Sequence, residues 1–356
     1  THSGAGLFLV RHCSTVSTAK SEASTKSRPA SVICACAPTY PNADTSVAKG
    51  SIAKIDVDAK GNFVRLTSSA TAPATVLNGA PGYANDGALT PADSTGMFYA
   101  VNTMQPPFQP SSNAPASGDS SKLYADTSKA TTLPQQTQTN IGDLLSGKNI
   151  DWAWYAGAWQ ATLEQYKGSE SLPRIPNFQY HHQPFNYFKQ QGPENRAERD
   201  KRLRDAGLGD ESSTNKFFAD AQAGKLPAVT FYKPQGNLNM HAGYADVASG
   251  DRHITRALKV LQESPQWKNM VVVVTVDENG GWWDHVAPPQ GDRWGPGSRV
   301  PALVVSPFAR KGTVDHTVYD TASILRLITR LHDLPLLEGL KVRNEAFAAR
   351  GALPPG

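Results

Sequence analysis

Two neighbouring carboxylates, Asp277 and Glu278, follow one of the most apolar runs of the sequence, residues 270–276. A run of this kind predicts a strand buried on both faces, as in a parallel sheet covered by helices. Ligands of such sheets gather at the carboxyl ends of the strands, where these two acids stand. Adjacent ionised carboxylates repel each other, and a divalent cation or a shared proton relieves the repulsion. The pair therefore predicts a metal site, with a solvated polar turn as the alternative.

Histidines stand close to other predicted strand ends. His181 and His182 are adjacent in NFQYHHQPF, and single histidines occur at His241, His253 and His285. Imidazoles near two carboxylates suit either metal binding or hydrogen bonding to phosphate oxygens. A single surface histidine is usually only that, whereas the adjacent pair is a modest signal of function.

The elements that must position these groups alternate between strands and helices. Strands are predicted at 31–38, 149–157, 226–234, 270–276 and 301–307, and helices at 139–148, 251–262 and 320–332. In the last two helices, 3.6-residue periodicity predicts that the buried faces carry Ile254, Leu258 and Leu261, and Ile324, Ile328 and Leu331. This order predicts an α/β fold, an α/β/α sandwich with a mostly parallel central sheet.

Two other regions read as insertions into this fold. Residues 51–69 alternate apolar and polar positions around Lys60-Gly61-Asn62, a hairpin pattern. Residues 70–130, rich in Ala, Pro, Ser, Asn and Gly, predict long surface loops. Farther on, the alternation in WAWY places Trp152 and Trp154 on one strand face, which favours a packing role.

Composition bounds the class of protein. The 356 residues are 39% apolar, enough for one large domain with a substantial core. The net charge of +4 comes from mixed charges without a basic run, which argues against a nucleic-acid binder. Apolar stretches are too short for a transmembrane segment. Cys13, Cys34 and Cys36 lack a second pair at zinc spacing, so buried thiols are expected.

Residues 1–31 differ from the rest of the chain in composition and in hydrophobic pattern. Positions 11–31 carry few apolar anchors and no clear period, which predicts disorder. We therefore expect an atypical leader over 1–31, disordered or misplaced, followed by one domain over 32–356.

Four segments together carry a family resemblance. They are WAWYAGAW, FQYHHQPFNYF, FYKPQGNLNMHAGYADVASGDRHI and TVDENGGWWDHVAPP, in that order. In these motifs the chain resembles, over about residues 32–334, the bacterial phosphoesterase family of acid phosphatases and phospholipases C in the alkaline-phosphatase-like superfamily. It is most similar to the acid phosphatase branch. The resemblance implies an α/β/α fold and metal-dependent hydrolysis of phosphomonoesters.

The resemblance also implies roles for individual residues. Asp277 and Glu278 would bind the divalent metal, whose identity stays open, and the three histidines at 181, 182 and 241 would line the phosphate pocket. His285 belongs to the same signature as a further catalytic candidate. The reaction implied passes through a phosphoenzyme on a small-molecule or lipid phosphate ester, and the location implied is periplasmic or secreted.

The sequence departs from the family pattern at its beginning. The expected ENRSFD-like segment with further metal ligands is missing, and PENRAERD at 193–200 lies in a charged, helix-like stretch that we interpret as a chance match. The nucleophile would fall near Ser24 or Thr25, in the wrong context. A shifted reading frame, a true variant and an unrelated extension are the three explanations, and the first predicts little activity for this chain.

Three alternative functions stay open. One is a phospholipase C-type phosphodiesterase. Another is a phosphoesterase-like protein that binds without catalysis, in accord with the missing motifs. The third follows from LFLVRHCST at 7–15, which is similar to the start of histidine phosphatases, with His12 as nucleophile and Arg11 as phosphate donor; Cys13 in place of glycine and the lack of a second matching histidine argue against it.

Overall fold

The structure is a computed structural model in which two sets of residues are described. They are residues 6–10, 33, 52–54, 80–82 and 99–101, and all of 104–354 except 130–131, 167–177, 243–244, 279–281, 283, 287–288, 291–297, 350 and 352.

A six-stranded sheet forms the centre of the described part. Its strands, in spatial order, are β10 (Ala302–Val305), β8 (Met270–Thr275), β1 (Gly6–Val10), β7 (Val229–Lys233), β5 (Trp152–Gly157) and β6 (Leu203–Gly207). All neighbouring strands pair in parallel except β10, which runs antiparallel to β8 at one edge. The prediction of a mostly parallel sheet is therefore confirmed.

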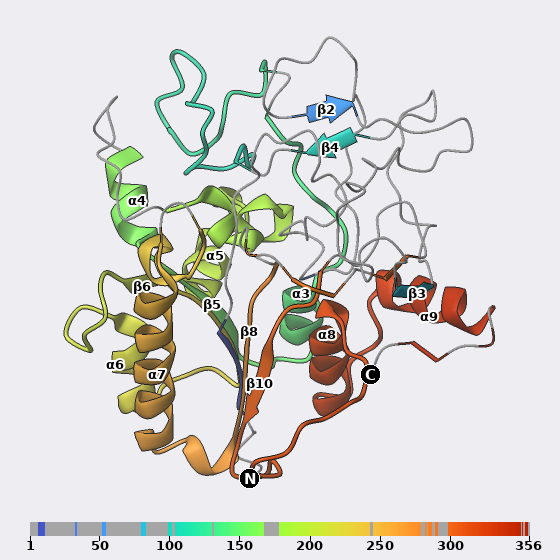
Figure 1. Cartoon of the computed structure of the whole chain (residues 1–356). Coiled ribbons are helices and arrows are strands. Elements are labelled where there is room, and N and C mark those ends of the chain that lie inside the picture. The colour runs from blue at the N-terminus through green and yellow to red at the C-terminus, as the bar shows by residue number, and fades with distance from the viewer. Residues whose placement is uncertain are drawn as a thin grey trace.

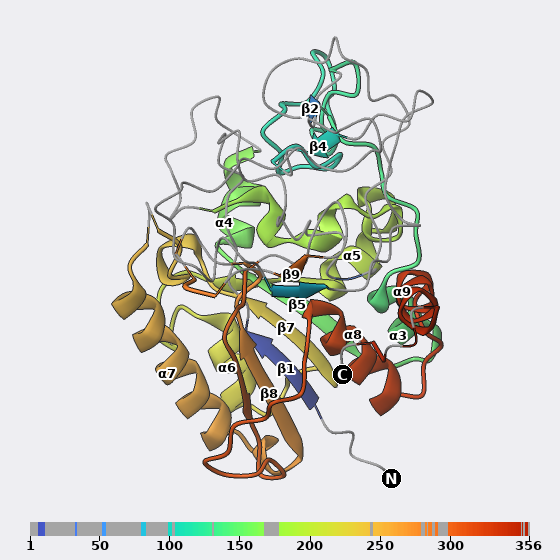
Figure 2. The same ribbon diagram turned by 45° about the vertical axis from the view of Figure 1, so that its right-hand side comes forward.

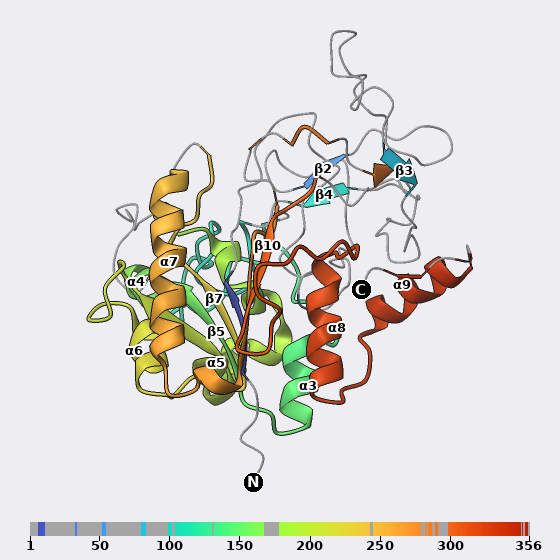
Figure 3. The ribbon, with the colours of Figure 1, turned by 60° about the horizontal axis from the view of Figure 1, so that its bottom comes forward.

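Helices cover both faces of this sheet (Figure 1, Figure 3). On one face lie α6 (Lys216–Gln222) and α7 (Val247–Glu263), and on the other α3 (Ile141–Gly147) and α8 (Thr321–Leu331). Each face has its own buried cluster of apolar side chains, which we call the α3/α8 core and the α6/α7 core. The expected α/β/α sandwich is present.

Strand alternation assigns side chains to the two cores. On β5, Trp152 and Trp154 enter the α3/α8 core, whereas Ala153 and Tyr155 enter the α6/α7 core. Successive residues of a strand point to opposite faces, so both faces of a central strand must be apolar. The expected packing role of the two tryptophans is confirmed, and Trp154 also stacks on Phe231 at 5.3 Å.

Helix boundaries follow from local capping. Asn140 accepts a hydrogen bond from the backbone N–H of Asp143, whose carboxylate accepts one from the N–H of Asn140, a capping box that starts α3. Asp246 and Asp320 cap α7 and α8 in a similar way.

The predicted buried faces of α7 and α8 hold in part. Leu261 and Ile328 are buried, and Ile254, Leu258 and Ile324 are partly buried against the two cores. Leu331, the last residue of α8, is 47% exposed, which corrects its prediction.

The remaining elements lie around this sandwich. They are β2 (Ile52–Lys54), β3 (Ala80–Gly82), β4 (Tyr99–Val101), α4 (Trp159–Tyr166), α5 (Arg196–Arg202), β9 (Pro289–Gln290), α9 (Glu338–Ala348) and the 3-10 turns Tyr180–His182, Pro184–Tyr187, Lys189–Gln191, Pro193–Asn195, Gly236–Leu238 and Trp267–Asn269. Among the described residues, no helix combines the length and apolarity needed to cross a membrane.

Three expectations for the first part of the chain change. Residues 6–10, within the expected leader, form β1 in the middle of the main sheet, where the apolar run LFLV suits a strand between β7 and β8. Ile33, placed in a predicted strand, is helical and buried in the α3/α8 core. Strand β2 pairs with β4, and the expected hairpin partner in 62–69 lies outside the described residues, as does the rest of 1–31.

The region expected to form surface loops contains a buried segment. Phe108, Gln109 and Ser111 are almost fully buried. The guanidinium of Arg199 donates to the Gln109 carbonyl at 3.1 Å and to the Asn186 side-chain oxygen at 2.7 Å. The composition of this segment hides its burial, because its polar backbone is satisfied by partners that are distant in sequence.

Candidate functional site

Two chain segments meet beyond the carboxyl edge of the main sheet. Strands β7 and β8 flank β1, and all three run in the same direction (Figure 2). After β7 the chain continues through residues 234–246, which contain His241. After β8 it continues through 276–286, which contain Asp277 and Glu278. Parallel strands with one intervening strand thus bring segments that are far apart in sequence to one edge.

His241 and Glu278 face each other at this edge. The His241 Nε2 atom lies 3.8 Å from Oε1 of Glu278, and each side chain is 12% exposed. The Nδ1 atom of His241 lies 2.6 Å from the carbonyl oxygen of Ala242. A carbonyl only accepts hydrogen bonds, so Nδ1 carries a proton and Nε2 is the nitrogen directed at the carboxylate. The predicted proximity of an imidazole to the acidic pair is observed for this histidine.

The backbone before His241 is held in an uncommon conformation. Met240 has φ of 64°, in the left-handed region that costs energy for a residue with a side chain. Its side chain packs against α7 at Gly250, where an added Cβ would lie 2.2 Å from Met240 Cγ. Asn239, which is buried, accepts a hydrogen bond from the backbone N–H of His241 at 3.0 Å. Packing and a local turn therefore fix the direction of the imidazole.

A tryptophan connects the two segments. The indole Nε1 of Trp282 donates to the carbonyl oxygen of Met240 at 2.8 Å. The ring itself is 48% exposed, so it borders the site as a partly open wall. Trp283, the next residue, lies outside the described residues.

The histidine pair lies on the α3/α8 side of the sheet. His181 and His182 are both buried in a 3-10 turn, with ring centroids 5.3 Å apart. The indole of Trp154 donates to the backbone carbonyl of His182 at 2.8 Å, which attaches the pair to β5. Phe178 packs edge-on against the His182 ring.

His285 has a different environment. Its side chain is 74% exposed, with Nδ1 3.9 Å from Asp284. The Asp284 carboxylate is held by both the Nε and Nη2 atoms of Arg299 at 3.1 and 3.0 Å. Hydrogen bonds from Arg299 lower the pKa of Asp284 to about 2. The Arg299 side chain is 58% exposed and forms this ion pair.

Another histidine–carboxylate contact among the described residues belongs to the interior. His253 is completely buried in α7, where its Nδ1 lies 2.7 Å from Asp210 and its Nε2 lies 2.7 Å from the Tyr232 hydroxyl. Asn215 also donates to that hydroxyl at 3.0 Å. Both ring nitrogens thus have partners inside the protein. The helix predicted over 251–262 contains His253, and the structure confirms this helical position in α7.

The sequence did not predict the burial of Lys233. Lys233, the last residue of β7, is 2% exposed. Its place in the apolar run predicted as a strand over 226–234 was a signal that could have separated it from a surface lysine.

The described residues include candidate metal ligands. Asp277 and Glu278 are oxygen ligands of the kind that divalent cations prefer, and His241 stands beside them. Among the described residues, no group of three or more histidine, cysteine, aspartate and glutamate side chains converges on one point. The acidic pair therefore fits as a contributor, and the described donors do not form a complete set. The three cysteines and the positions Arg11, His12, Ser24 and Thr25 lie outside the described residues.

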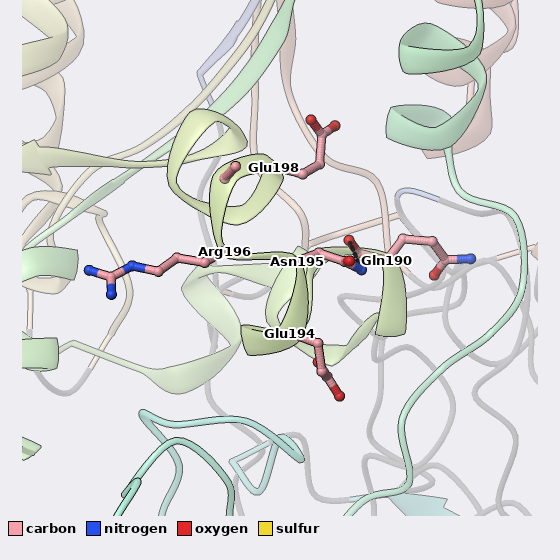
Figure 4. A pocket seen from close by; sticks show the side chains of 6 residues that line it. Gln190, Glu194, Asn195, Arg196 and Glu198 are labelled. Carbon is pink, nitrogen blue, oxygen red and sulfur yellow. Dashed lines mark hydrogen bonds between the residues drawn. The ribbon is translucent and has the colours of Figure 1, made fainter.

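The segment PENRAERD forms a 3-10 turn and the start of α5. It borders a shallow surface hollow, in which Glu194 and Glu198 point in opposite directions and Arg196 points away from both (Figure 4). Asn195 donates to the carbonyl oxygen of Gln190 at 3.1 Å. Diverging side chains do not create a ligand site, in agreement with the interpretation of this segment as a chance match.

Comparison with known proteins places this geometry in a family. Residues 60–335 match the Phosphoesterase family. Over 164 residues the chain is 33% identical to Non-specific phospholipase C6 of Arabidopsis thaliana, which covers 38% of this chain and 31% of that protein. Phospholipase C B of Mycobacterium tuberculosis is 32% identical over 145 residues, 34% of this chain and 28% of that protein. Non-hemolytic phospholipase C of Pseudomonas aeruginosa is 28% identical over 141 residues, which are 31% of this chain and 20% of that protein.

The chain thus matches less than a third of the length of these curated relatives. All three are phospholipases C by name, so the narrower assignment to the acid phosphatase branch stays a prediction. The family match itself extends over most of the chain and includes the acidic pair, all four candidate histidines and the strands that carry them. The chain belongs to the Phosphoesterase family.

Proposed function

We propose that the protein hydrolyses phosphate esters at the carboxyl edge of its main sheet, with a divalent metal ion bound in part by Asp277 and Glu278. The observation that carries the proposal is the approach of His241 to Glu278 within 3.8 Å. It gathers an imidazole and two carboxylates at one strand end. Carboxylates suit the cation, and an imidazole suits proton transfer or hydrogen bonding at a phosphate oxygen.

The residues divide the work by their chemistry. When bound, a divalent cation neutralises phosphate charge and stabilises a deprotonated hydroxyl nucleophile. In this proposal His241, oriented through its Nδ1 bond to Ala242, directs Nε2 to the phosphate or leaving group. His181 and His182 donate to phosphate oxygens from the α3/α8 side, and His285 is a further donor from the exposed loop. The phosphoryl group passes to a serine or threonine hydroxyl, and water then releases phosphate.

Phosphomonoesters are the substrate class that we favour, and phosphodiesters such as phospholipid head groups are the second candidate. Similarity to the acid phosphatase branch supports the first. The phospholipase C names of the curated relatives support the second. The proposed location, periplasmic or secreted, depends on the family resemblance; a fractionation of the producing cells that finds the protein in the cytoplasm would contradict it.

A direct assay tests the function. Hydrolysis of p-nitrophenyl phosphate and of bis(p-nitrophenyl) phosphate is measured from about pH 5 to 8, around the titration range of histidine. The protein is first treated with chelator and then supplied with single divalent ions. We expect turnover that disappears on chelation and returns with metal. A folded protein that binds inorganic phosphate but hydrolyses neither ester with any metal is instead a non-catalytic binding protein.

A further inference from the structure

We infer that Lys233 is a phosphate-binding residue that makes the site prefer dianionic phosphomonoesters over monoanionic diesters. The inference rests on the proposed function and names its substrate class. Its starting point is an unusual feature: the Lys233 side chain is 2% exposed, and no hydrogen-bond acceptor among the described residues reaches its Nζ atom. Burying an ammonium group without a partner is strongly unfavourable, so a resident anion is the expected compensation.

The strand register places Lys233 on the same side of the sheet as the histidine pair. On β7, Val229 and Phe231 enter the α3/α8 core, and alternation puts Lys233 on that face too. Its partner in β5 is Ala156, which also belongs to the α3/α8 core.

The preceding pair of opposite residues on this face, Trp154 and Phe231, connects the sheet to the histidine pair. Phe231 is opposite Trp154, and the Trp154 indole donates to the His182 carbonyl at 2.8 Å. The pair Ala156–Lys233 comes two residues after the pair Trp154–Phe231 along the two strands. Lys233 therefore lies closer to the carboxyl edge of the sheet than Trp154, whose indole holds the His182 backbone.

The ends of β5 and β7 are also in tight contact. An added Cβ at Gly157 would lie 2.3 Å from the backbone nitrogen of Gln235. The chain that follows Lys233 is thus packed against the end of β5, at the edge where a parallel sheet binds its ligands. A buried cation at this position points to an oxyanion that enters from the same edge.

Charge selects the ligand. A phosphomonoester has a second pKa near 6 and carries close to two negative charges at neutral pH, whereas a diester carries one. A lysine is a compact charge with three donors, suited to one oxyanion oxygen. A buried cation attracts a dianion more strongly than a monoanion, because the Coulomb energy grows with the charge of the ligand.

The test compares Lys233→Met with two controls. Val229→Ala changes packing on the same strand and face without a change of charge. Lys216→Met removes an exposed lysine whose Nζ pairs with Asp205 at 2.9 Å. The measurements are Kd for inorganic phosphate by calorimetry, Tm in phosphate-free buffer, and the ratio of kcat/KM for p-nitrophenyl phosphate to that for bis(p-nitrophenyl) phosphate.

We expect Lys233→Met to weaken phosphate binding about 10- to 100-fold, the equivalent of one charged hydrogen bond, and to lower the monoester-to-diester ratio by a similar factor. Its Tm in phosphate-free buffer should equal or exceed that of the parent, because a buried unpaired cation has been removed. Both controls should keep the ratio and the phosphate Kd within about twofold, while Lys233→Arg restores part of the binding.

An unchanged phosphate Kd, or a Tm well below that of the parent, overturns the inference and makes Lys233 a structural residue. Failure of the proposed function is a separate outcome. If the parent hydrolyses neither ester, the phosphate Kd alone decides: weaker binding by Lys233→Met still supports an oxyanion site, and equal binding overturns it.

Discussion

Three histidines lie within 4 Å of a carboxylate in the described part of this protein, and two of them, His253 and His241, have contrasting surroundings. His253 lies in the α6/α7 layer, with both ring nitrogens bonded at 2.7 Å to Tyr232 and Asp210. His241 lies at the carboxyl edge of the main sheet, with Nε2 3.8 Å from Glu278 and Nδ1 on a backbone carbonyl. The imidazole–carboxylate contact is thus short and involves a buried ring in the first region. In the second region the distance is longer and the contact lies at a strand end.

The difference separates a structural contact from a candidate catalytic one. A buried ring with both nitrogens bonded inside the protein stabilises the fold and leaves no atom for a ligand. The 3.8 Å between the His241 imidazole and the Glu278 carboxylate is longer than an ordinary hydrogen bond, and this contact lies at the strand end where parallel sheets bind ligands. The histidine's surroundings, and not its identity, therefore indicate its role.

The largest effect should come from the acidic partner at the strand end. Glu278→Gln removes a negative charge proposed to hold the cation, so we expect kcat/KM for a phosphate ester to fall on the order of 100- to 1000-fold. Tm should change by only a few degrees. The matched control is Glu211→Gln, an exposed carboxylate paired with Arg256, which should retain activity. Full activity of the Glu278 variant would remove the strand-end contact from catalysis.

The interior contact should act on stability instead. His253→Ala removes a fully buried side chain and two hydrogen bonds, so we expect the free energy of unfolding in urea to fall by about 2 to 4 kcal/mol. Activity per folded molecule should persist. The exposed His316 provides the control, since His316→Ala should leave the unfolding curve unchanged. Loss of turnover in folded His253→Ala would contradict the division into two kinds of contact.

A glycine on α7 connects the two regions. Gly250→Ala would bring a Cβ to 2.2 Å from Met240 Cγ, so we expect a loss of about 1 to 3 kcal/mol in unfolding free energy through overpacking. The displaced Met240 should also misdirect His241 and lower kcat/KM. Gly147→Ala is the control, because nothing lies within 4 Å of its added Cβ. Equal behaviour of the two variants would show that Met240 does not position the imidazole.

The smallest effect should be seen in pH dependence. Burial lowers the pKa of His253 below its usual 6.5, outweighing the hydrogen bond and charge of Asp210 that raise it, and Arg256 lowers it further. The unfolded state therefore binds the proton more readily, so this contribution to stability is present above about pH 6.5 and is lost as the pH falls below it.

Urea unfolding between pH 7.5 and 5 measures this loss, with His253→Gln as the comparison. We expect the parent's stability to fall more steeply on acidification than that of the variant. Parallel curves would mean that the buried contact does not contribute to acid sensitivity.

The fold was largely predictable from local pattern. The apolar runs at β5, β7 and β8 and the periodic helices α7 and α8 were all predicted, because their burial requires apolar residues at fixed spacing. Ile33 and the segment around Phe108 were not, since their burial comes from distant partners that no local period encodes. Antiparallel pairing of β10 with β8 is likewise invisible in its own residues.

The sequence by itself determined that two carboxylates follow a buried strand and that several histidines lie near polar turns. Only the tertiary structure decided which histidine lies beside the acids. Strands β7 and β8 run in parallel on the two sides of β1, so the segments that follow them meet at one edge and His241 lies beside Glu278. His253 instead contacts Asp210 in the α6/α7 layer. It also decided that Lys233 is buried, on the side of the histidine pair. The physical reason is that side-chain type and spacing fix local conformation, whereas strand order and packing fix which distant groups share one space.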